Sequence, residues 1–166
     1  MTFARFVASG CGAGFAPRAP GTVGSLLALV LGALLMLLPA FVLPLAVLVA
    51  ALGGLWAIRA SGAAEEPNGG SGGGSDGDPG WVVIDEVAGQ WIALLGLPRP
   101  SAIGLLAAFL LFRLLDIAKP GPVGWADRQG GAAGIMADDL IAGAIAAGIL
   151  WAIASRFPGL LTGWPG

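Results

Sequence analysis

The chain has 166 residues, of which 57% are hydrophobic and 11% are charged, and its mean hydropathy is +0.87. A soluble domain of this length cannot bury so much apolar side chain, so the composition predicts a protein whose solvent is lipid. The formal net charge is −2 and there is no basic tract, which argues against a nucleic-acid partner. The single cysteine, Cys11, excludes an internal disulfide.

Five apolar segments are predicted to form membrane-embedded helices, at residues 23–38, 41–58, 81–97, 102–118 and 138–154. Pro39 separates the first two so closely that they must form a hairpin. We therefore expect an all-α, polytopic membrane protein with about five membrane-embedded helices in a single domain over residues 1–166. The N-terminal residues lack the long apolar core of a signal peptide, and we expect them to be retained.

Two connecting segments are predicted to be loops. Residues 65–78, EEPNGGSGGGSDGD, cannot bury a core, and their Gly/Ser run is like an engineered linker as well as a natural flexible loop. Residues 119–137 are broken by Pro120, Pro122 and several glycines. The glycines at 130–134 would let this second loop bring its backbone near a ligand.

The placement of charge predicts an orientation in the membrane. With the N-terminal arm in the cytoplasm, only Arg99 and Arg156 face outward, as the positive-inside rule favours. The inward-facing bases are Arg5, Arg18, Arg59, Arg113, Lys119 and Arg128. The same threading brings six carboxylates to the cytoplasmic face, namely Asp85, Glu86, Asp116, Asp127, Asp138 and Asp139.

Six neighbouring carboxylates would repel one another strongly without cations. Basic side chains offset part of this repulsion, and a hard divalent ion bound by oxygen atoms would offset the rest. Magnesium fits best, because it accepts a few carboxylates together with water and phosphate oxygens. The sequence therefore predicts a Mg²⁺ site at the cytoplasmic face.

The acidic pairs also have simpler structural interpretations. Asp85 and Glu86 at the start of a helix would favour its dipole, and Asp138 and Asp139 at the start of the last helix would cap it. Carboxylates at a membrane boundary are costly and usually functional, which favours a site. Gly89, one turn beyond Asp85, would leave room for a close neighbour or a ligand.

Basic and hydroxyl side chains near these acids could bind an anion. Arg113, Asp116 and Lys119 are spaced three residues apart, which predicts an ion-pair ladder on one helix face with Lys119 at the rim, where it could meet a phosphate. Before the first apolar segment, PGTVGS offers backbone N–H groups and the hydroxyls of Thr22 and Ser25 to an anion. A simple capped turn explains that motif equally well.

The residue types that are missing narrow the chemistry. The chain has no histidine, which excludes the lipid phosphatases that work through paired histidines. Six residues separate Cys11 from Arg18, one more than the loop of a cysteine phosphatase allows, and there is no P-loop motif. Carboxylates, a metal and basic residues remain, and these are the parts needed for metal-assisted attack on phosphorus.

Four blocks of the sequence, in order, resemble the phosphatidylglycerophosphatase A family: GFAPRAPGTVGS, VVIDEVAGQW, FRLLDIAKPGPVGWADR and GIMADDLIAG. This resemblance covers most of the chain. It implies Mg²⁺-dependent hydrolysis of phosphatidylglycerophosphate to phosphatidylglycerol and phosphate, in the inner membrane of a bacterium, at an active site that faces the cytoplasm. Many members have His-Gly-Gly before the Gly-Ile-Met, whereas this chain has GGAAGIM, which leaves the contribution of that loop open.

The residues and the resemblance together predict roles for individual side chains. The expected metal ligands, with Asp127 as a further ligand or supporting partner, are Asp85, Glu86, Asp116, Asp138 and Asp139. The expected phosphate-binding residues are Thr22, Ser25, Arg113, Lys119 and Arg128. The expected catalytic residues are Asp85, Glu86, Asp116, Lys119 and Asp139. The nucleophile is either water or one of these aspartates, and the sequence does not separate the two.

Two other functions could use the same acidic cluster. A small cation transporter or channel would place carboxylates along a path through the bilayer, whereas here they gather at one face. A phospholipid phosphotransferase would need a more Asp-rich motif along a single helix, which the chain lacks. The sequence leaves the oligomeric state open.

Overall fold

The computed structural model describes residues 1–65, 79–157 and 159–162, and all regular secondary structure within them is helical. The helices there, in chain order, are α1 (Phe3–Ala8), η1 (Ala13–Phe15), α2 (Pro20–Leu35), α3 (Val42–Ser61), η2 (Ala63–Glu65), α4 (Ile84–Leu94), α5 (Ala102–Ala118), α6 (Pro122–Asp127) and α7 (Gly131–Arg156). The all-α prediction is confirmed. The predicted Gly/Ser loop lies outside the described residues from residue 66 onward.

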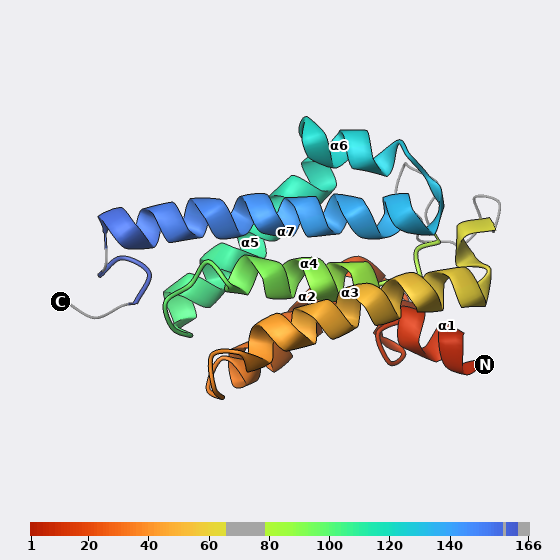
Figure 1. Ribbon diagram of the computed structural model, residues 1–166, viewed down its shortest axis with the longest axis horizontal. Helices are drawn as coiled ribbons and strands as arrows, with labels where there is room; N and C mark the ends of the chain where they lie inside the picture. The colour runs from red at the N-terminus through yellow and green to blue at the C-terminus, as the bar shows by residue number, and fades with distance from the viewer. Residues whose placement is uncertain (66–78, 158, 163–166) are drawn as a thin grey trace.

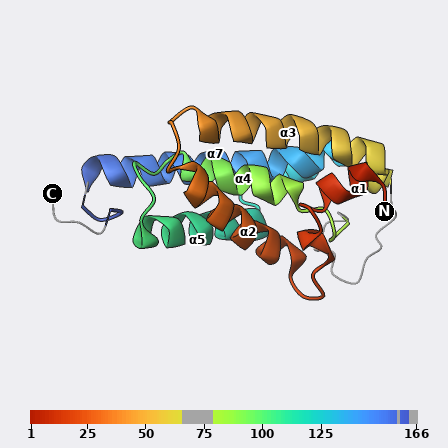
Figure 2. The same ribbon diagram turned by 90° about the horizontal axis from the view of Figure 1, so that it is seen from below.

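Helix α4 is the central element of the bundle. It contacts α2, α3, α5 and α7, and Figures 1 and 2 show it lying beside α7, the longest helix. Seven of its eleven residues are buried, including the small residues Ala88, Gly89 and Ala93. Small side chains let neighbouring backbones approach closely, which is how helices commonly pack in lipid. The segment predicted at 81–97 is therefore a short core helix enclosed by the others.

Helix α2 packs along α4 through small residues. A Cβ added to Gly24 would lie 2.8 Å from Cβ of Val83, and one added to Gly32 would lie 2.4 Å from Cδ1 of Leu94. Between these points, Trp91 donates its indole N–H to the carbonyl oxygen of Ala28 at 2.8 Å. These contacts fix the register of the two helices and place the first turn of α2 beside the start of α4.

Two of the described helices, α3 and α7, are long and apolar enough to cross a membrane, and α2 is apolar but shorter. Helix α4 has eleven residues, so it is about 16 Å long against the roughly 30 Å hydrocarbon core of a bilayer. Large apolar side chains are exposed on α2, α3 and α5, as expected for a surface in contact with lipid; they include Val30, Leu34, Leu45, Leu52, Leu106 and Leu110. These features support a membrane protein, whereas five membrane-embedded helices stay a prediction.

The segment predicted as a loop at 119–137 is largely helical. It contains α6, which begins at Pro122, a residue whose fixed φ suits the first position of a helix. It also contains the start of α7 at Gly131, where a φ of +63° turns the chain into the helix. The prediction that Asp138 and Asp139 stand at a helix start is therefore wrong, because both lie about two turns inside α7.

The two ends of the bundle differ in charge. Arg99 lies in the connection between α4 and α5, and Arg156 is the last residue of α7. Both lie at one end of the bundle, where Ser101 donates a hydrogen bond to the carbonyl oxygen of Leu161. The start of α4, with Asp85, lies at the other end. The predicted separation of these two arginines from the acidic residues is confirmed, and the assignment of the acidic end to the cytoplasm stays a prediction.

Candidate active site

Three carboxylates from two helices meet at the start of α4, two of them buried and that of Glu86 partly buried. Asp85 and Glu86 lie in the first turn of α4, and Asp139 comes from α7. One oxygen from each of the three side chains lies within 4.8 Å of the other two. Oε2 of Glu86 and Oδ1 of Asp139 are buried and have no hydrogen-bond partner. We call these three residues the acidic trio.

Backbone contacts hold the acidic trio in place. The N–H of Val83 donates to the carbonyl oxygen of Ala8 at 3.0 Å, which anchors the start of α4 to α1. Oδ1 of Asp85 accepts the N–H of Glu86 at 3.0 Å, so one of the free donors at the helix start is satisfied. A Cβ on Gly89 would lie 2.6 Å from the carbonyl oxygen of Asp139, which confirms that Gly89 leaves room for a close neighbour. That neighbour is the backbone of α7.

Arg113 of α5 joins three helices around the trio. Its Nη1 forms an ion pair with Oδ2 of Asp116 on the same helix and lies 3.9 Å from Oε1 of Glu86 on α4. Its Nη2 donates to Oγ1 of Thr22 on α2 at 3.4 Å. Its Nε is buried and has no hydrogen-bond partner. Arg113 is thus a cation beside the acidic trio, and its Nε–H can still donate a hydrogen bond.

Lys119 leaves the face of α5 that carries Arg113 and Asp116. It ends the helix in the left-handed conformation, with φ at +44°, and its Nζ binds Asp127 of α6 and lies 3.2 Å from Oδ2 of Asp138 on α7. Burial alone would lower the pKa of Lys119. The hydrogen bonds and negative charges of Asp127 and Asp138 outweigh burial, so the pKa lies above its ordinary value. The predicted ladder through Lys119 is therefore wrong, because the left-handed residue redirects the side chain.

All six predicted carboxylates belong to one connected cluster. Asp116 is linked to the acidic trio through Arg113, and Asp138 and Asp127 are linked to each other through Lys119. The charges of Asp116 and Asp138 are close enough to repel that of Asp139. Two bases thus face six acids, and the excess negative charge calls for a further cation.

The acidic trio fits a metal ion bound by oxygen. Its donors are carboxylate oxygens, the ligands that hard divalent cations prefer, and two of its oxygens lack any other partner. Without a cation, burying three carboxylates together would be costly. The trio could therefore hold a metal ion, and its chemistry alone does not choose between divalent ions.

The remaining predicted phosphate-binding residues lie at different depths. Thr22 reaches the cluster through its contact with Arg113. Ser25 is fully buried and donates its hydroxyl hydrogen to the carbonyl oxygen of Gly21 at 2.8 Å. Arg128, at the end of α6, is exposed and makes no ion pair with any described residue. Thr22 thus joins the cluster directly, and the other two do not.

Sequence reasoning missed two residues at the site. Gln90 on α4 is fully buried, and neither of its side-chain polar atoms has a hydrogen-bond partner. Gly21 lies so close to the trio that a Cβ there would stand 2.2 Å from Oε1 of Glu86. The position of Gln90, four residues after Glu86 in an apolar helix, was a usable signal. Gly21 belongs to the PGTVGS motif, but no local signal predicted its contact with Glu86, because that contact joins two helices.

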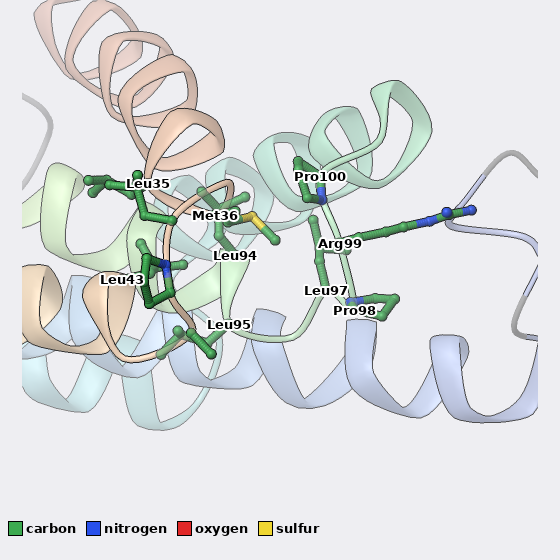
Figure 3. Close-up of a pocket in the computed structure, with 12 residues that line it drawn as sticks. Leu35, Met36, Leu43, Leu94, Leu95, Leu97, Pro98, Arg99 and Pro100 are labelled. Carbon is green, nitrogen blue, oxygen red and sulfur yellow. The ribbon is translucent and has the colours of Figure 1, made fainter.

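A pocket of about 290 Å³ lies away from the acidic cluster, between the turn that joins α2 to α3 and the connection between α4 and α5 (Figure 3). Its lining is mainly apolar and includes Leu35, Leu43 and Leu94. Arg99 is the one charged residue of this lining, and Figure 3 shows its side chain extending away from the leucines. The pocket therefore offers no polar groups suited to the chemistry of the acidic end.

Comparison with known proteins identifies the family. Residues 6–154 match the phosphatidylglycerophosphatase A family. The chain is 37% identical over 153 residues to phosphatidylglycerophosphatase A of Escherichia coli (strain K12), covering 92% of this chain and 84% of that protein. It is 34% identical over 149 residues to phosphatidylglycerophosphatase A of Haemophilus influenzae, covering 89% and 86% of the two chains.

A third relative is named for a different substrate. It is a Bacteroides thetaiotaomicron protein named as a candidate phosphatidylinositol-3-phosphatase, 40% identical over 144 residues, with 82% of this chain and 84% of that protein covered. No solved structure matches the chain significantly. The transporter and phosphotransferase alternatives are not favoured by these relatives. The chain belongs to the phosphatidylglycerophosphatase A family and is a phosphatase.

Proposed function

We propose that this protein hydrolyses the terminal phosphate monoester of phosphatidylglycerophosphate to phosphatidylglycerol and phosphate, with Mg²⁺ held by the acidic trio. The observation that carries the proposal is the trio itself, three largely buried carboxylates beside Arg113 with two oxygens left without partners. Two relatives named for this reaction support the substrate. We place the site at the cytoplasmic face of a bacterial inner membrane, where the lipid would reach it from the inner leaflet.

The carboxylates would divide the work of holding the ion. Asp85, Glu86 and Asp139 would be its ligands, and Asp116 and Asp138 would complete or orient the set. When bound, Mg²⁺ would supply positive charge that stabilises the charge developing on the phosphate oxygens. Mg²⁺ suits a site with few protein carboxylates because it retains water and accepts phosphate oxygens.

The bases and a hydroxyl would bind the phosphate itself. Arg113 has an unpartnered Nε–H that can donate to a phosphate oxygen, and Thr22, already in contact with Arg113, would position the same group. Lys119, held by Asp127 and Asp138, would act through its charge. Arg128 is exposed and could meet the lipid as it approaches.

The reaction requires one bond to form at phosphorus and one to break. An oxygen of water, or of one of the aspartates, attacks the phosphorus, and the bond from phosphorus to the glycerol oxygen breaks. The glycerol oxygen leaves and takes up a proton, which comes from the attacking water or, when an aspartate attacks, from solvent water, to give the free hydroxyl of phosphatidylglycerol. If an aspartate attacks first, water then hydrolyses the phosphoaspartate and returns the carboxylate.

Release of inorganic phosphate by the purified protein in detergent micelles tests this proposal. We expect release from phosphatidylglycerophosphate with Mg²⁺ and none with excess chelator, while phosphatidylinositol 3-phosphate serves as the competing substrate. Release from the inositol lipid alone would reassign the substrate and keep the reaction class. Undiminished release in chelator would remove the metal from the proposal. Folded protein that is inactive on both lipids would overturn the proposed reaction.

A further inference from the structure

The most unusual buried side chain outside the charged cluster is that of Gln90. It is fully buried, and neither its Oε1 nor its Nε2 has a hydrogen-bond partner. A primary amide can donate two hydrogen bonds and accept two, so leaving it unpaired in an apolar interior is costly. The amide of Gln90 can therefore both accept hydrogen bonds from a bound molecule and donate them to it.

The unpaired groups of the protein gather at one place. Among the described residues, the buried side-chain atoms without partners belong to Glu86, Gln90, Arg113 and Asp139. Three of these residues form the charged site, and the fourth, Gln90, lies four residues beyond Glu86 on α4, on the same helical face. One bound molecule about as long as one helical turn could therefore supply partners both to the unpaired atoms of the charged site and to the amide of Gln90.

The direction from Glu86 to Gln90 matches the geometry of a lipid headgroup. Gln90 lies about one turn, roughly 5.4 Å, farther along α4 and away from its acidic start. In phosphatidylglycerophosphate, the terminal phosphate is the end of the headgroup, and the glycerol that carries it lies between that phosphate and the acyl chains. The middle carbon of this glycerol, one carbon away from the carbon that carries the terminal phosphate, bears a secondary hydroxyl that can both donate and accept a hydrogen bond.

We infer that Gln90 binds the secondary hydroxyl of the headgroup glycerol and selects lipids that carry it; this inference rests on the function proposed above. The amide oxygen accepts the hydroxyl hydrogen, and the amide N–H donates to the hydroxyl oxygen. A metal ion at this position would satisfy only the amide oxygen and leave the N–H groups unpaired. A hydroxyl satisfies both kinds of atom, and a neutral amide can bind it without adding charge to an acidic site.

This inference is tested by comparing two substrates with the unaltered protein and with one variant. The substrates are phosphatidylglycerophosphate and its 1,3-propanediol analogue, which lacks only the secondary hydroxyl. We expect the unaltered protein to prefer the natural lipid at least tenfold in kcat/KM, because the analogue leaves a buried amide unpaired. Gln90→Met, which keeps the length of the side chain without its polar atoms, should reduce that preference to about twofold or less.

The controls separate recognition from folding and from the proposed function. Leu94→Met changes a buried apolar residue of the same helix and should keep the preference. The inference is wrong if Gln90→Met lowers turnover of both lipids by the same factor. It is also wrong if the unaltered protein hydrolyses both lipids equally, and that result does not depend on whether a variant folds. Inactivity of the unaltered protein on both lipids would instead overturn the proposed function, and the inference with it.

Discussion

Gly89 of α4 and Gly143 of α7 lie against each other where the two helices pack, and a Cβ on Gly143 would lie 2.3 Å from the carbonyl oxygen of Gly89. A Cβ on Gly89 would in turn lie 2.6 Å from the carbonyl oxygen of Asp139. Backbone atoms cannot move aside as the end of a flexible side chain can. This pair of glycines therefore sets the separation of the two helices that supply the acidic trio.

Gly143→Ala should force α4 and α7 apart. We expect a loss of about 1–3 kcal/mol in the free energy of unfolding, the usual cost of overpacking a buried contact, and a fall in activity. Thermal unfolding in detergent measures the first effect. Gly148→Ala is the matched control, because Gly148 lies on the same helix with no atom within 4 Å of an added Cβ. Equal unfolding temperatures for the two variants would contradict this account of the crossing.

Gly21→Ala should damage the site and leave the fold largely intact. The added Cβ would lie 2.2 Å from Oε1 of Glu86, and a carboxylate at the end of a flexible side chain can move away at little cost in stability. Its displacement disturbs the proposed metal ligands, so we expect phosphate release to fall about 10- to 100-fold. Gly53→Ala, with no atom within 4 Å of its added Cβ, should keep full activity. A large loss of thermal stability in Gly21→Ala would show that the contact is structural.

Asp139→Asn should have opposite effects on stability and on metal binding. The amide removes one negative charge from a repulsive cluster, so the protein without metal should unfold at an equal or higher temperature. The rise in unfolding temperature that Mg²⁺ gives the unaltered protein should be lost, because binding to the folded state alone is what produces it. Activity should fall at least 100-fold. An unchanged response to Mg²⁺ would show that Asp139 is not a ligand.

Lys119→Met should destabilise the protein by about 1–2 kcal/mol, because Asp127 and Asp138 lose their shared cation in a partly buried site. The raised pKa of Lys119 fixes how this loss depends on pH. The stabilisation is complete below the unfolded-state pKa of about 10.4 and disappears only as the pH rises through the higher folded-state value. The difference between the two proteins in unfolding free energy should therefore be constant from about pH 6 to 9. A difference that varied across that range would require another titrating group.

The sequence was sufficient to predict the helical class and the acidic cluster. Asp85 and Asp116 lie near the ends of apolar segments, and the alternation of helix direction brings such ends together. The pairing of Arg113 with Asp116 also follows from local spacing, since residues three apart share a helix face. These predictions succeeded because each depends on a single helix or on the order of helices.

Features that depend on backbone conformation or on distant contacts were not predicted. The early start of α7 depends on Gly131, and a glycine-rich stretch predicts a loop as readily as the start of a helix. The turn of Lys119 toward α6 depends on a left-handed conformation that lysine seldom adopts. The closeness of Gly21 to Glu86 depends on how α2 packs against α4, which no spacing within one helix reveals.

The short central helix has a consequence for how the protein is made. An eleven-residue segment that carries Asp85, Glu86 and Gln90 is too short and too polar to be inserted by itself as a span during synthesis. Its partners include α5 and α7, which leave the ribosome after it. We therefore expect α4 to take its place late, when α7 arrives, so that assembly of the bundle and completion of the acidic trio are the same event.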